Sequence, residues 1–377
     1  MKKNAKKLVP ACLKRGTETI EGLRTRIDAI DSRIVALLNK RTGYVLKVGK
    51  AKSLGNKDYY APERERAIIA RLTSLNKGPF PNNALKSVYR EIMSASLSLE
   101  KPLRVAFLGP QATFTHEAAM RQFGSSGEFI AKQEIEEVFD DVEKNRADFG
   151  VVPIENTIEG VVTHTLDMLV TSQLKISAEV MLPISLALMN KTGVLSDVTR
   201  VASMPHAIAQ CRGWLKNNLS DVEIMSAPST ARGAEMAAVA PSIAAVASRS
   251  AAALYDLKIV ADGIEDNANG FTRFLVIGSK TAKRTGTDKT SVMFAIKDAP
   301  GALYSILKPF AEKNINLTKI ESRPMKTKAW EYLFFVDLDG HISDARVKAA
   351  IGKLEESCSF LKVLGSYPRS LPFLKER

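Results

Sequence analysis

The sequence predicts a multidomain protein with an all-helical N-terminal domain, a two-lobed α/β domain and a C-terminal βαββαβ module. The chain has 377 residues, more than the roughly 100 to 200 residues of an ordinary domain. Apolar residues recur at helical spacing before Lys101-Pro102, and short apolar strands alternate with helices after it. We therefore expect a basic flexible tail at 1–17, helices at 18–101, the α/β domain at 102–279, a linker at 280–289 and the last module at 290–370.

A long apolar stripe predicts the first helix, which begins near Ile20. The stripe consists of Leu23, Ile27, Ile30, Ile34 and Leu37, which succeed one another at helical steps. Pro62 suits the first turn of a second helix that stops near Gly78-Pro79, and a third helix is expected from about Asn83 to Leu99. Helices of such unequal length cannot bury the stripe by themselves, so we expect an intertwined dimer.

Alternating strands and helices predict the α/β domain. Val105–Gly109 is expected to form a buried strand that ends in a glycine turn, with a helix from Phe114 and a second strand at Phe149–Ile154. Further strands are expected at Ser185–Met189, Arg200–Ala202, Ala244–Ala247 and Phe274–Ile277. This order implies a sheet of parallel type with helices on both faces, in two lobes around a cleft.

The C-terminal module follows a polar, lysine-rich stretch, Gly278–Lys289, that is typical of a linker. We expect strand, helix, strand, strand, helix and strand at Ser291–Ile296, Ala302–Lys313, Leu317–Ser322, Glu331–Leu338, Ser343–Cys358 and Phe360–Leu364. That order is the ferredoxin-like βαββαβ unit.

Composition argues against several classes of function. The formal net charge is +13, and residues 1–17 and 18–102 hold 22 of the 54 Lys and Arg against nine of the 41 acidic residues. No stacking aromatics or zinc finger accompany these charges, so we expect a small polyanionic substrate and no nucleic acid. We expect a cytoplasmic protein without membrane association, because the opening lacks a signal-peptide core and no apolar run is long enough to span. Scattered cysteines and histidines predict no metal site. We also expect no cofactor.

Two arginines of the first predicted helix, Arg24 and Arg41, are roughly 25 Å apart at 1.5 Å per residue. One small molecule cannot contact both, so a second subunit must supply one of them if both serve one site. The charges from Glu21 through Arg41, in Val48–Lys52 and in Pro62–Arg66 resemble, in their spacing, the all-helical chorismate mutase family. The resemblance implies a pocket lined by the partner subunit's Arg24 and by Arg41, Lys52, Arg64, Glu65, Ser96 and Glu100.

The chemistry of a chorismate mutase suits such a pocket. Its pericyclic shift needs no nucleophile, only the reactive conformer and stabilisation of charge on the breaking ether oxygen. Two positions depart from the family: Ala61 stands where an acid is common, and Glu100 where many members carry a glutamine that donates to the ether oxygen. Glutamate donates only when protonated, so we expect mutase activity to fall as pH rises. The alternative is that these charges are solvated helix faces.

The α/β domain carries a second set of motifs. Gly109–His116 follows a strand and opens a helix whose N–H groups could receive a carboxylate, but it lacks the features of a nucleotide loop. Together with Val151–Val162, Ser229-Thr230-Ala231 and Phe271-Thr272-Arg273-Phe274, it resembles prephenate dehydratase across residues 103–278. The resemblance implies a two-lobed, periplasmic-binding-protein-like fold.

Dehydration expels carbon dioxide and a ring hydroxyl, so it requires anion anchoring and a proton donor. The resemblance implies Thr272 as the catalytic residue, with Arg273 binding a carboxylate or holding the loop. The other candidates for the cleft wall are Thr113, Glu155, Asn156, Thr157, Ser203, Gln210, Ser229 and Thr230. Turn or cap duty is the alternative for each of them. Gly270 and Met204-Pro205-His206 depart from the family pattern, and Asn267 or Asn269 could compensate for the first.

Asp298–Leu303 and Glu321–Pro324 resemble the phenylalanine-binding motifs of ACT regulatory domains. The implied effector residues are Gly301, Ala302, Leu303, Glu321, Ser322, Arg323 and Pro324. An ordinary strand-to-helix turn is the alternative. We therefore expect a homodimer or homotetramer that converts chorismate to prephenate and prephenate to phenylpyruvate, inhibited by phenylalanine through the linker. An arogenate-preferring dehydratase and a non-enzymatic two-lobed sensor are the competing interpretations.

Overall fold

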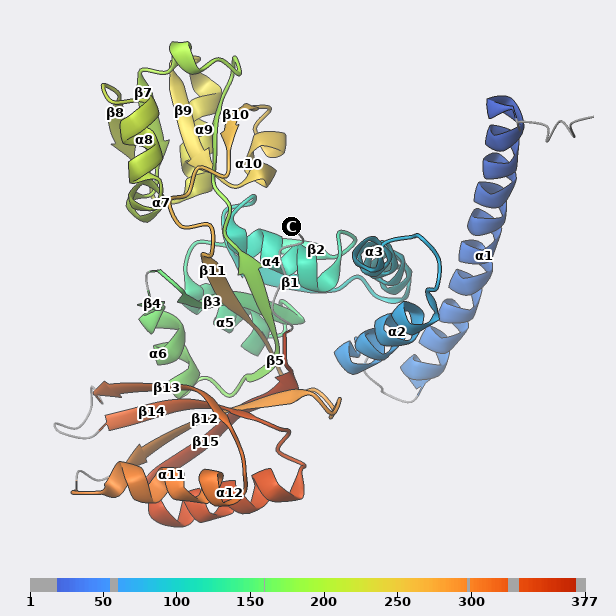
Figure 1. Ribbon diagram of the computed structural model, residues 1–377. Helices are drawn as coiled ribbons and strands as arrows, with labels where there is room; N and C mark the ends of the chain where they lie inside the picture. Colours follow the sequence, from blue (N-terminus) through green and yellow to red (C-terminus); the bar gives the residue numbers. More distant parts are fainter. Residues whose placement is uncertain (1–18, 55–59, 159, 297–298, 325–331, 371–377) are drawn as a thin grey trace, which may run out of the picture. The chain divides into compact units, whose positions relative to one another are not determined.

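The computed structural model describes residues 19–54, 60–158, 160–296, 299–324 and 332–370 (Figure 1). The chain divides into two compact units, residues 1–57 and 58–377. The described part of the first unit is one helix, α1 (Ile20–Leu54). The predicted stripe along α1 is exposed, with Ile30 at 53% and Leu37 at 63%. The helix itself is confirmed, and its apolar face is exposed among the described residues.

The second unit begins with α2 (Pro62–Leu75) and α3 (Asn82–Glu100), both at the places predicted from proline and apolar spacing. Tyr60, just before α2, is buried with its ring 5.2 Å from that of Phe123 and 5.1 Å from that of Phe149. Its hydroxyl accepts a hydrogen bond of 2.9 Å from Gln122 Nε2. These contacts attach the helix pair to the α/β domain.

The first lobe of the α/β domain is a sheet in the order β2-β1-β3-β11-β5, with the short β4 paired to β3. Its strands are β1 (Arg104–Leu108), β2 (Glu128–Lys132), β3 (Phe149–Asn156), β4 (Gly160–Val161), β5 (Lys175–Pro183) and β11 (Phe271–Gly278). Its helices are α4 (Phe114–Phe123), α5 (Ile135–Glu143) and α6 (Thr163–Thr171). The expected parallel pairing is confirmed for β2, β1 and β3, whereas β11 runs antiparallel to both β3 and β5, so the sheet is mixed.

The second lobe is a sheet in the order β10-β6-β9-β7-β8. Its strands are β6 (Ala187–Asn190), β7 (Arg200–Ser203), β8 (Glu223–Ser226), β9 (Ile243–Ala247) and β10 (Lys258–Asp262). Its helices are η1 (Leu195–Asp197), α7 (Pro205–Gln210), α8 (Arg212–Asn218), α9 (Thr230–Val239) and α10 (Arg249–Leu254). The chain enters this lobe after β5 and returns through β11, which explains why those two strands are antiparallel. The two-lobed arrangement is confirmed.

The C-terminal module has the predicted βαββαβ order and one antiparallel sheet, β13-β14-β12-β15. Its elements are β12 (Asp288–Ile296), α11 (Ala302–Glu312), β13 (Leu317–Pro324), β14 (Tyr332–Asp339), α12 (Ala345–Ser357) and β15 (Phe360–Pro368). The expected linker extends too far: β12 begins at Asp288, and Lys289 is buried within it.

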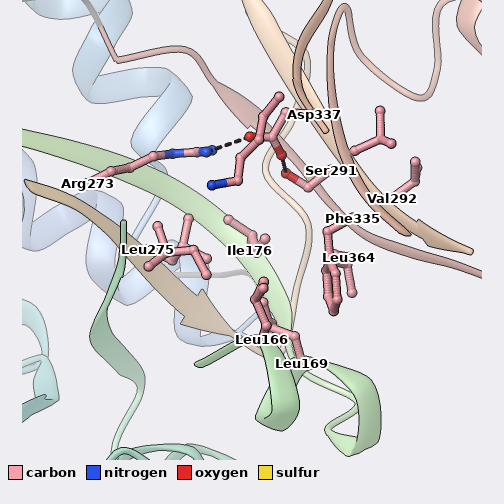
Figure 2. A pocket seen from close by; sticks show the side chains of 13 residues that line it. Leu166, Leu169, Ile176, Arg273, Leu275, Ser291, Val292, Phe335, Asp337 and Leu364 are labelled. Carbon is pink, nitrogen blue, oxygen red and sulfur yellow. Dashed lines mark hydrogen bonds and ion pairs between the residues drawn. The ribbon is translucent and has the colours of Figure 1, made fainter. Parts of the chain in front are cut away.

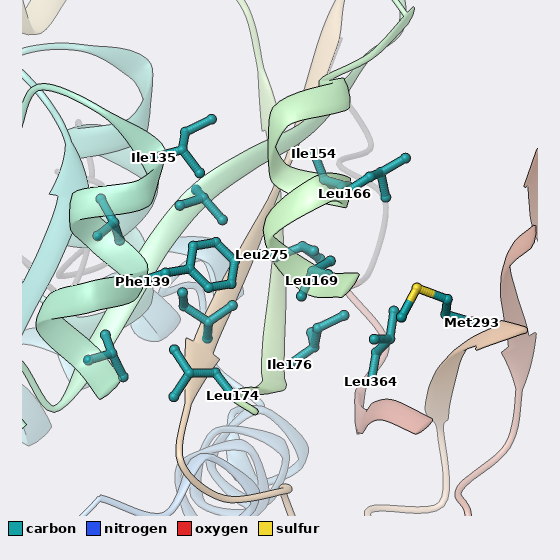
Figure 3. Close-up of a cluster of buried hydrophobic side chains, with 14 of the residues drawn as sticks. Ile135, Phe139, Ile154, Leu166, Leu169, Leu174, Ile176, Leu275, Met293 and Leu364 are labelled. Carbon is teal, nitrogen blue, oxygen red and sulfur yellow. The ribbon is translucent and has the colours of Figure 1, made fainter. Parts of the chain in front are cut away.

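One hydrophobic core joins this module to the first lobe. Leu169, Ile176 and Leu275 from the lobe pack with Met293 and Leu364 from the module (Figure 3). The backbones of β5 and β15 also approach closely: a Cβ on Gly365 would lie 2.2 Å from the carbonyl oxygen of Ile176. The module is therefore packed on the sheet of the first lobe, and the glycine is required by that contact. None of the described helices is long and apolar enough to cross a membrane.

Candidate active sites

The pairing of β3 with β11 brings two sequence motifs together. Thr272 lies opposite Asn156 in the register, and Arg273 lies opposite Glu155. Asn156 Nδ2 donates a hydrogen bond of 2.8 Å to Thr272 Oγ1. Asn156 Oδ1 accepts from the backbone N–H of Ile158 at 2.8 Å, which fixes the orientation of the amide. Because the threonine oxygen accepts from the amide, its own O–H is left to point toward another acceptor.

Thr157 and Gly270 shape the backbone next to this pair. Phe271 donates its N–H to Thr157 Oγ1 at 2.9 Å, and Thr157 N–H donates to the carbonyl of Phe271 at 2.9 Å. Gly270 N–H donates to the carbonyl of Asn267, whose side chain accepts from Asn269 N–H at 3.0 Å. Thr157 therefore helps to hold this turn, and Asn267 holds the turn before the atypical glycine.

The loop after β1 links the two lobes. Thr113 is the N-cap of α4, accepting from His116 N–H at 3.3 Å, while its hydroxyl donates to the carbonyl of Pro110 at 2.9 Å. Ser248, which lies in the second lobe after β9, donates to the carbonyl of Ala112 at 3.0 Å. The loop is thus held from both lobes.

Candidates in the second lobe lie at the end of β7 or follow β7 and β8 in the chain. Ser203 ends β7, is fully buried and donates to the carbonyl of Val246 at 2.6 Å. Ser229 caps α9 by accepting from Arg232 N–H at 3.0 Å, and Thr230 is buried in the first turn of that helix. Gln210 ends α7, and its carbonyl accepts from Asp266 N–H at 2.7 Å. Ser203 and Ser229 have hydrogen bonds that already explain them structurally.

Arg273 faces away from Thr272, toward the C-terminal module. Its Nη1 donates to Asp337 at 2.5 Å (Figure 2). Its Nε donates to Glu179 at 2.8 Å and its Nη2 to the hydroxyl of Tyr367 at 2.9 Å. Only 8% of the side chain is exposed. Of the two roles expected for Arg273, holding the local structure is the one these contacts support.

Sequence reasoning missed the partners of Arg273. Burial works to raise the pKa of Asp337, but the nearby charges of Arg273 and Lys289 and the hydrogen bond from Ser291 bring it below its ordinary value. A signal was available, because Asp337 and Glu179 are charged residues inside otherwise apolar strands. Such residues are rarely buried unless they are paired.

Glu155 also differs from expectation. Its carboxylate forms an ion pair of 2.7 Å with Lys319 on β13. The strand that carries one of the expected effector motifs therefore contacts a residue that was expected in the cleft wall.

The expected mutase residues divide between the two units. Arg24, Arg41 and Lys52 lie on α1, whereas Arg64, Glu65, Ser96 and Glu100 lie on α2 and α3. Desolvation by burial raises the pKa of Glu65 to about 7, although the charge of Arg90 opposes the shift. Glu100 Oε2 is buried and has no hydrogen-bond partner among the described residues. Ser96 donates to the carbonyl of Ile92 at 2.6 Å.

The expected effector motifs lie at the start of α11 and along β13. Gly301 has a left-handed backbone, with φ of 76°, and is the N-cap of α11, which begins with Ala302 and Leu303. Arg323 donates to the carbonyl of Thr163 at 2.8 Å and pairs with Asp167, both on α6. The other motif residues on β13 are Glu321, Ser322 and Pro324. Asp298 falls outside the described residues.

The chain thus combines N-terminal helices, a two-lobed α/β domain with a threonine-asparagine pair and a βαββαβ module packed on the first lobe, an arrangement that suits a multidomain enzyme. Family models agree with the three parts: chorismate mutase type II matches residues 23–101, prephenate dehydratase residues 105–282 and the ACT domain residues 290–356. The chain belongs to the bifunctional chorismate mutase/prephenate dehydratases. It therefore carries an isomerase and a lyase activity in one polypeptide.

Individual relatives support this assignment along nearly the whole chain. The bifunctional chorismate mutase/prephenate dehydratase of Aquifex aeolicus (strain VF5) is 50% identical over 94% of this chain and 99% of its own length. The protein of the same name from Neisseria gonorrhoeae is 41% identical, again over 94% and 99%. A solved prephenate dehydratase from Arthrobacter aurescens, in complex with L-Phe, is 38% identical with a TM-score of 0.67 and covers 71% of this chain and 90% of that one.

Proposed function

We propose that Thr272 is the catalytic residue of the dehydratase and that it acts by donating its hydroxyl proton in a hydrogen bond to the departing ring oxygen. The observation that supports this is the 2.8 Å hydrogen bond from Asn156, which occupies the threonine oxygen as an acceptor and leaves its O–H available. A threonine hydroxyl is a weak acid, so it stabilises the leaving oxygen by a hydrogen bond while another group supplies the proton with which the ring hydroxyl leaves as water. The bond to the ring carboxylate breaks at the same time and releases carbon dioxide, and its electron pair completes the aromatic ring.

The carboxylates of prephenate need anion-binding groups in the same cleft. We assign this role to the first turns of α4 and α9, where N–H groups point out of the helix and Thr113, Ser229 and Thr230 stand beside them. Gln210 and Thr157 complete the proposed wall. Arg273 is not included, because each of its three nitrogens donates to a protein acceptor.

For the mutase we propose a site shared by two copies of the chain. The exposed stripe on α1 needs a covering surface, and Arg24 and Arg41 are too far apart on one helix to hold one chorismate. In a homodimer, the partner subunit's Arg24 joins Arg41, Lys52, Arg64, Glu65, Ser96 and Glu100. Sedimentation of the full chain should show a dimer, or a tetramer made of two such dimers. A monomer with full mutase activity would contradict this shared site.

We further propose that phenylalanine is the effector and that it binds the C-terminal module near Gly301 and Glu321–Pro324. The left-handed glycine at the start of α11 lets a ligand approach free backbone N–H groups, which favour a carboxylate. The solved prephenate dehydratase of Arthrobacter aurescens is a complex with L-Phe, which agrees with such a ligand.

The substrate of the dehydratase is proposed to be prephenate, the product of the mutase on the same chain. Formation of phenylpyruvate from chorismate and from prephenate, with and without phenylalanine, tests this directly. We expect product from both substrates and inhibition by phenylalanine. If the enzyme turned over arogenate faster than prephenate, the result would favour an arogenate-preferring dehydratase. If it turned over neither compound, the result would favour a non-enzymatic sensor.

A further inference from the structure

A buried network of charges connects the strand of Thr272 to the regulatory module. Arg273 is on β11 and Glu179 on β5, both in the first lobe, whereas Lys289 and Asp337 are on β12 and β14 of the module. Glu179 Oε2 accepts from Arg273 Nε at 2.8 Å and from Lys289 Nζ at 2.9 Å. Two cations and two anions thus balance one another in a region closed to solvent, where ion pairs hold only if every group is partnered.

Hydroxyl groups complete the network on the module side. Tyr367 on β15 accepts from Arg273 Nη2 at 2.9 Å, and its oxygen lies 2.6 Å from Ser291 Oγ. Ser291 in turn donates to Asp337 (Figure 2). Three strands of the module, β12, β14 and β15, therefore each supply a partner to the group around Arg273.

The two faces of β11 contact different parts of the protein: one contacts Asn156 in the first lobe and the other contacts the C-terminal module. Successive side chains of a strand point to opposite faces, so Thr272 bonds to Asn156 while Arg273 reaches Asp337. A displacement of β11 along or across the sheet must move both. The position of the threonine hydroxyl is consequently tied to the position of the module's sheet.

We infer that Arg273 is a positioning residue, which fixes the strand of Thr272 to the regulatory sheet through Asp337, and that inhibition is transmitted by this contact. The inference deepens the proposed dehydratase site and rests on its proposed control by phenylalanine. It differs from a role in binding a substrate carboxylate, and the two roles predict different kinetics.

The first test replaces Asp337 without touching the cleft. Asp337→Asn should lower kcat for prephenate at least tenfold and leave KM within about twofold, because the substrate contacts are intact while β11 loses its anchor. Asp339→Asn is the matched control: it lies two residues further along β14, in a partly exposed ion pair of 3.2 Å with Arg369. That variant should keep both constants within about twofold.

The second test combines variants. If Arg273 acts through Asp337, Arg273→Gln and Asp337→Asn together should lower kcat no more than Arg273→Gln alone, and Arg273→Lys should recover part of the loss. A tenfold or larger rise in KM for Arg273→Gln, with Asp337→Asn unchanged from the parent, would overturn the inference in favour of substrate binding. Ser291→Ala removes one donor to Asp337 and gives a milder variant, expected to lower kcat in the same direction.

The third test separates coupling from effector binding. Calorimetry should show phenylalanine still binding to Asp337→Asn and to Ser291→Ala, which also reports that the module is folded, while saturating phenylalanine changes their turnover less than twofold. If phenylalanine inhibits these variants as strongly as it inhibits the parent, the inference is overturned, while the proposed regulation by phenylalanine still stands. A parent enzyme that phenylalanine neither binds nor inhibits would instead overturn the proposed regulation, and the combined variants would still decide the role of Arg273.

Discussion

Asn156 and Thr272 are 116 residues apart in the chain, yet the amide of one donates to the hydroxyl of the other at 2.8 Å. The contact exists because β3 and β11 pair antiparallel, with these residues opposite one another. It makes the threonine oxygen an acceptor and so links the topology of the first lobe to the proposed chemistry.

Asn156→Asp tests the direction of that hydrogen bond. A carboxylate at this position accepts the threonine proton instead of donating to its oxygen, so the hydroxyl is no longer available to the leaving group. Loss of one such donor typically costs about 10²–10³ in kcat, and we expect a fall of that order in prephenate turnover. Asn218→Asp, at the exposed end of α8, is the control and should leave turnover unchanged. Near-normal kcat in Asn156→Asp would contradict the proposed role.

Glu65 should make stability depend on pH. Its pKa is raised from 4.5 to about 7 by burial, so between these values the unfolded chain loses this proton and the folded chain keeps it. The contribution of Glu65 to the free energy of unfolding is therefore fully present below pH 4.5 and is lost as the pH rises to about 7. Above that pH it no longer changes. Glu65→Gln removes the penalty and should stabilise the protein by roughly 1 to 3 kcal/mol at pH 8 but by little at pH 4.5. Urea unfolding at both pH values measures the difference, and an equal effect at both would contradict the assignment.

Glu100 should give the mutase a separate pH dependence. Its buried Oε2 lacks a hydrogen-bond partner among the described residues, and a carboxyl group donates to the ether oxygen of chorismate only when protonated. We expect mutase kcat to fall as pH rises, and the fall to disappear in Glu100→Gln but to persist in Glu65→Gln. A profile that is flat in the parent, or unaltered by Glu100→Gln, would rule this out.

Gly301→Ala should weaken the effector site. The glycine has φ of 76°, and a Cβ there meets no atom of the described residues within 4 Å, so the effect comes from the backbone and not from a clash. The left-handed conformation costs a non-glycine residue about 1 to 2 kcal/mol, and relaxation of the turn should reduce phenylalanine affinity several-fold in calorimetry. Gly352→Ala, inside α12 with the same open space, is the matched control and should leave affinity unchanged. Equal affinity in both variants would place the effector elsewhere.

Local sequence patterns predicted the helices and the order of the C-terminal module because those elements depend on spacing and turn residues. Pro62 and the stripe from Leu23 to Leu37 located α2 and α1 to within a few residues. The strand β5 was missed: its charged Glu179 interrupts the apolar run, and the partner that neutralises it lies 94 residues away. Pairing of that kind is set by tertiary structure: the strand shows a charge that needs a partner, but it does not show which residue the partner is.

The candidate sites were predictable to a similar degree. Motif resemblance named Thr272 and Asn156, and the sheet placed them side by side. The same resemblance grouped Arg273 with them, because neighbours in sequence share a motif even when strand alternation sends their side chains to opposite faces. Only the packing of the module on the first lobe revealed what Arg273 contacts.

The most direct test of the account follows both reactions in one sample of the full chain carrying Thr272→Ala, with chorismate as substrate. Because the mutase residues are untouched, chorismate should disappear at the parental rate and prephenate should accumulate, with phenylpyruvate formed at least a hundredfold more slowly, the order expected for loss of one transition-state donor. Phenylpyruvate formed at close to the parental rate would contradict the assignment of Thr272 as the catalytic residue.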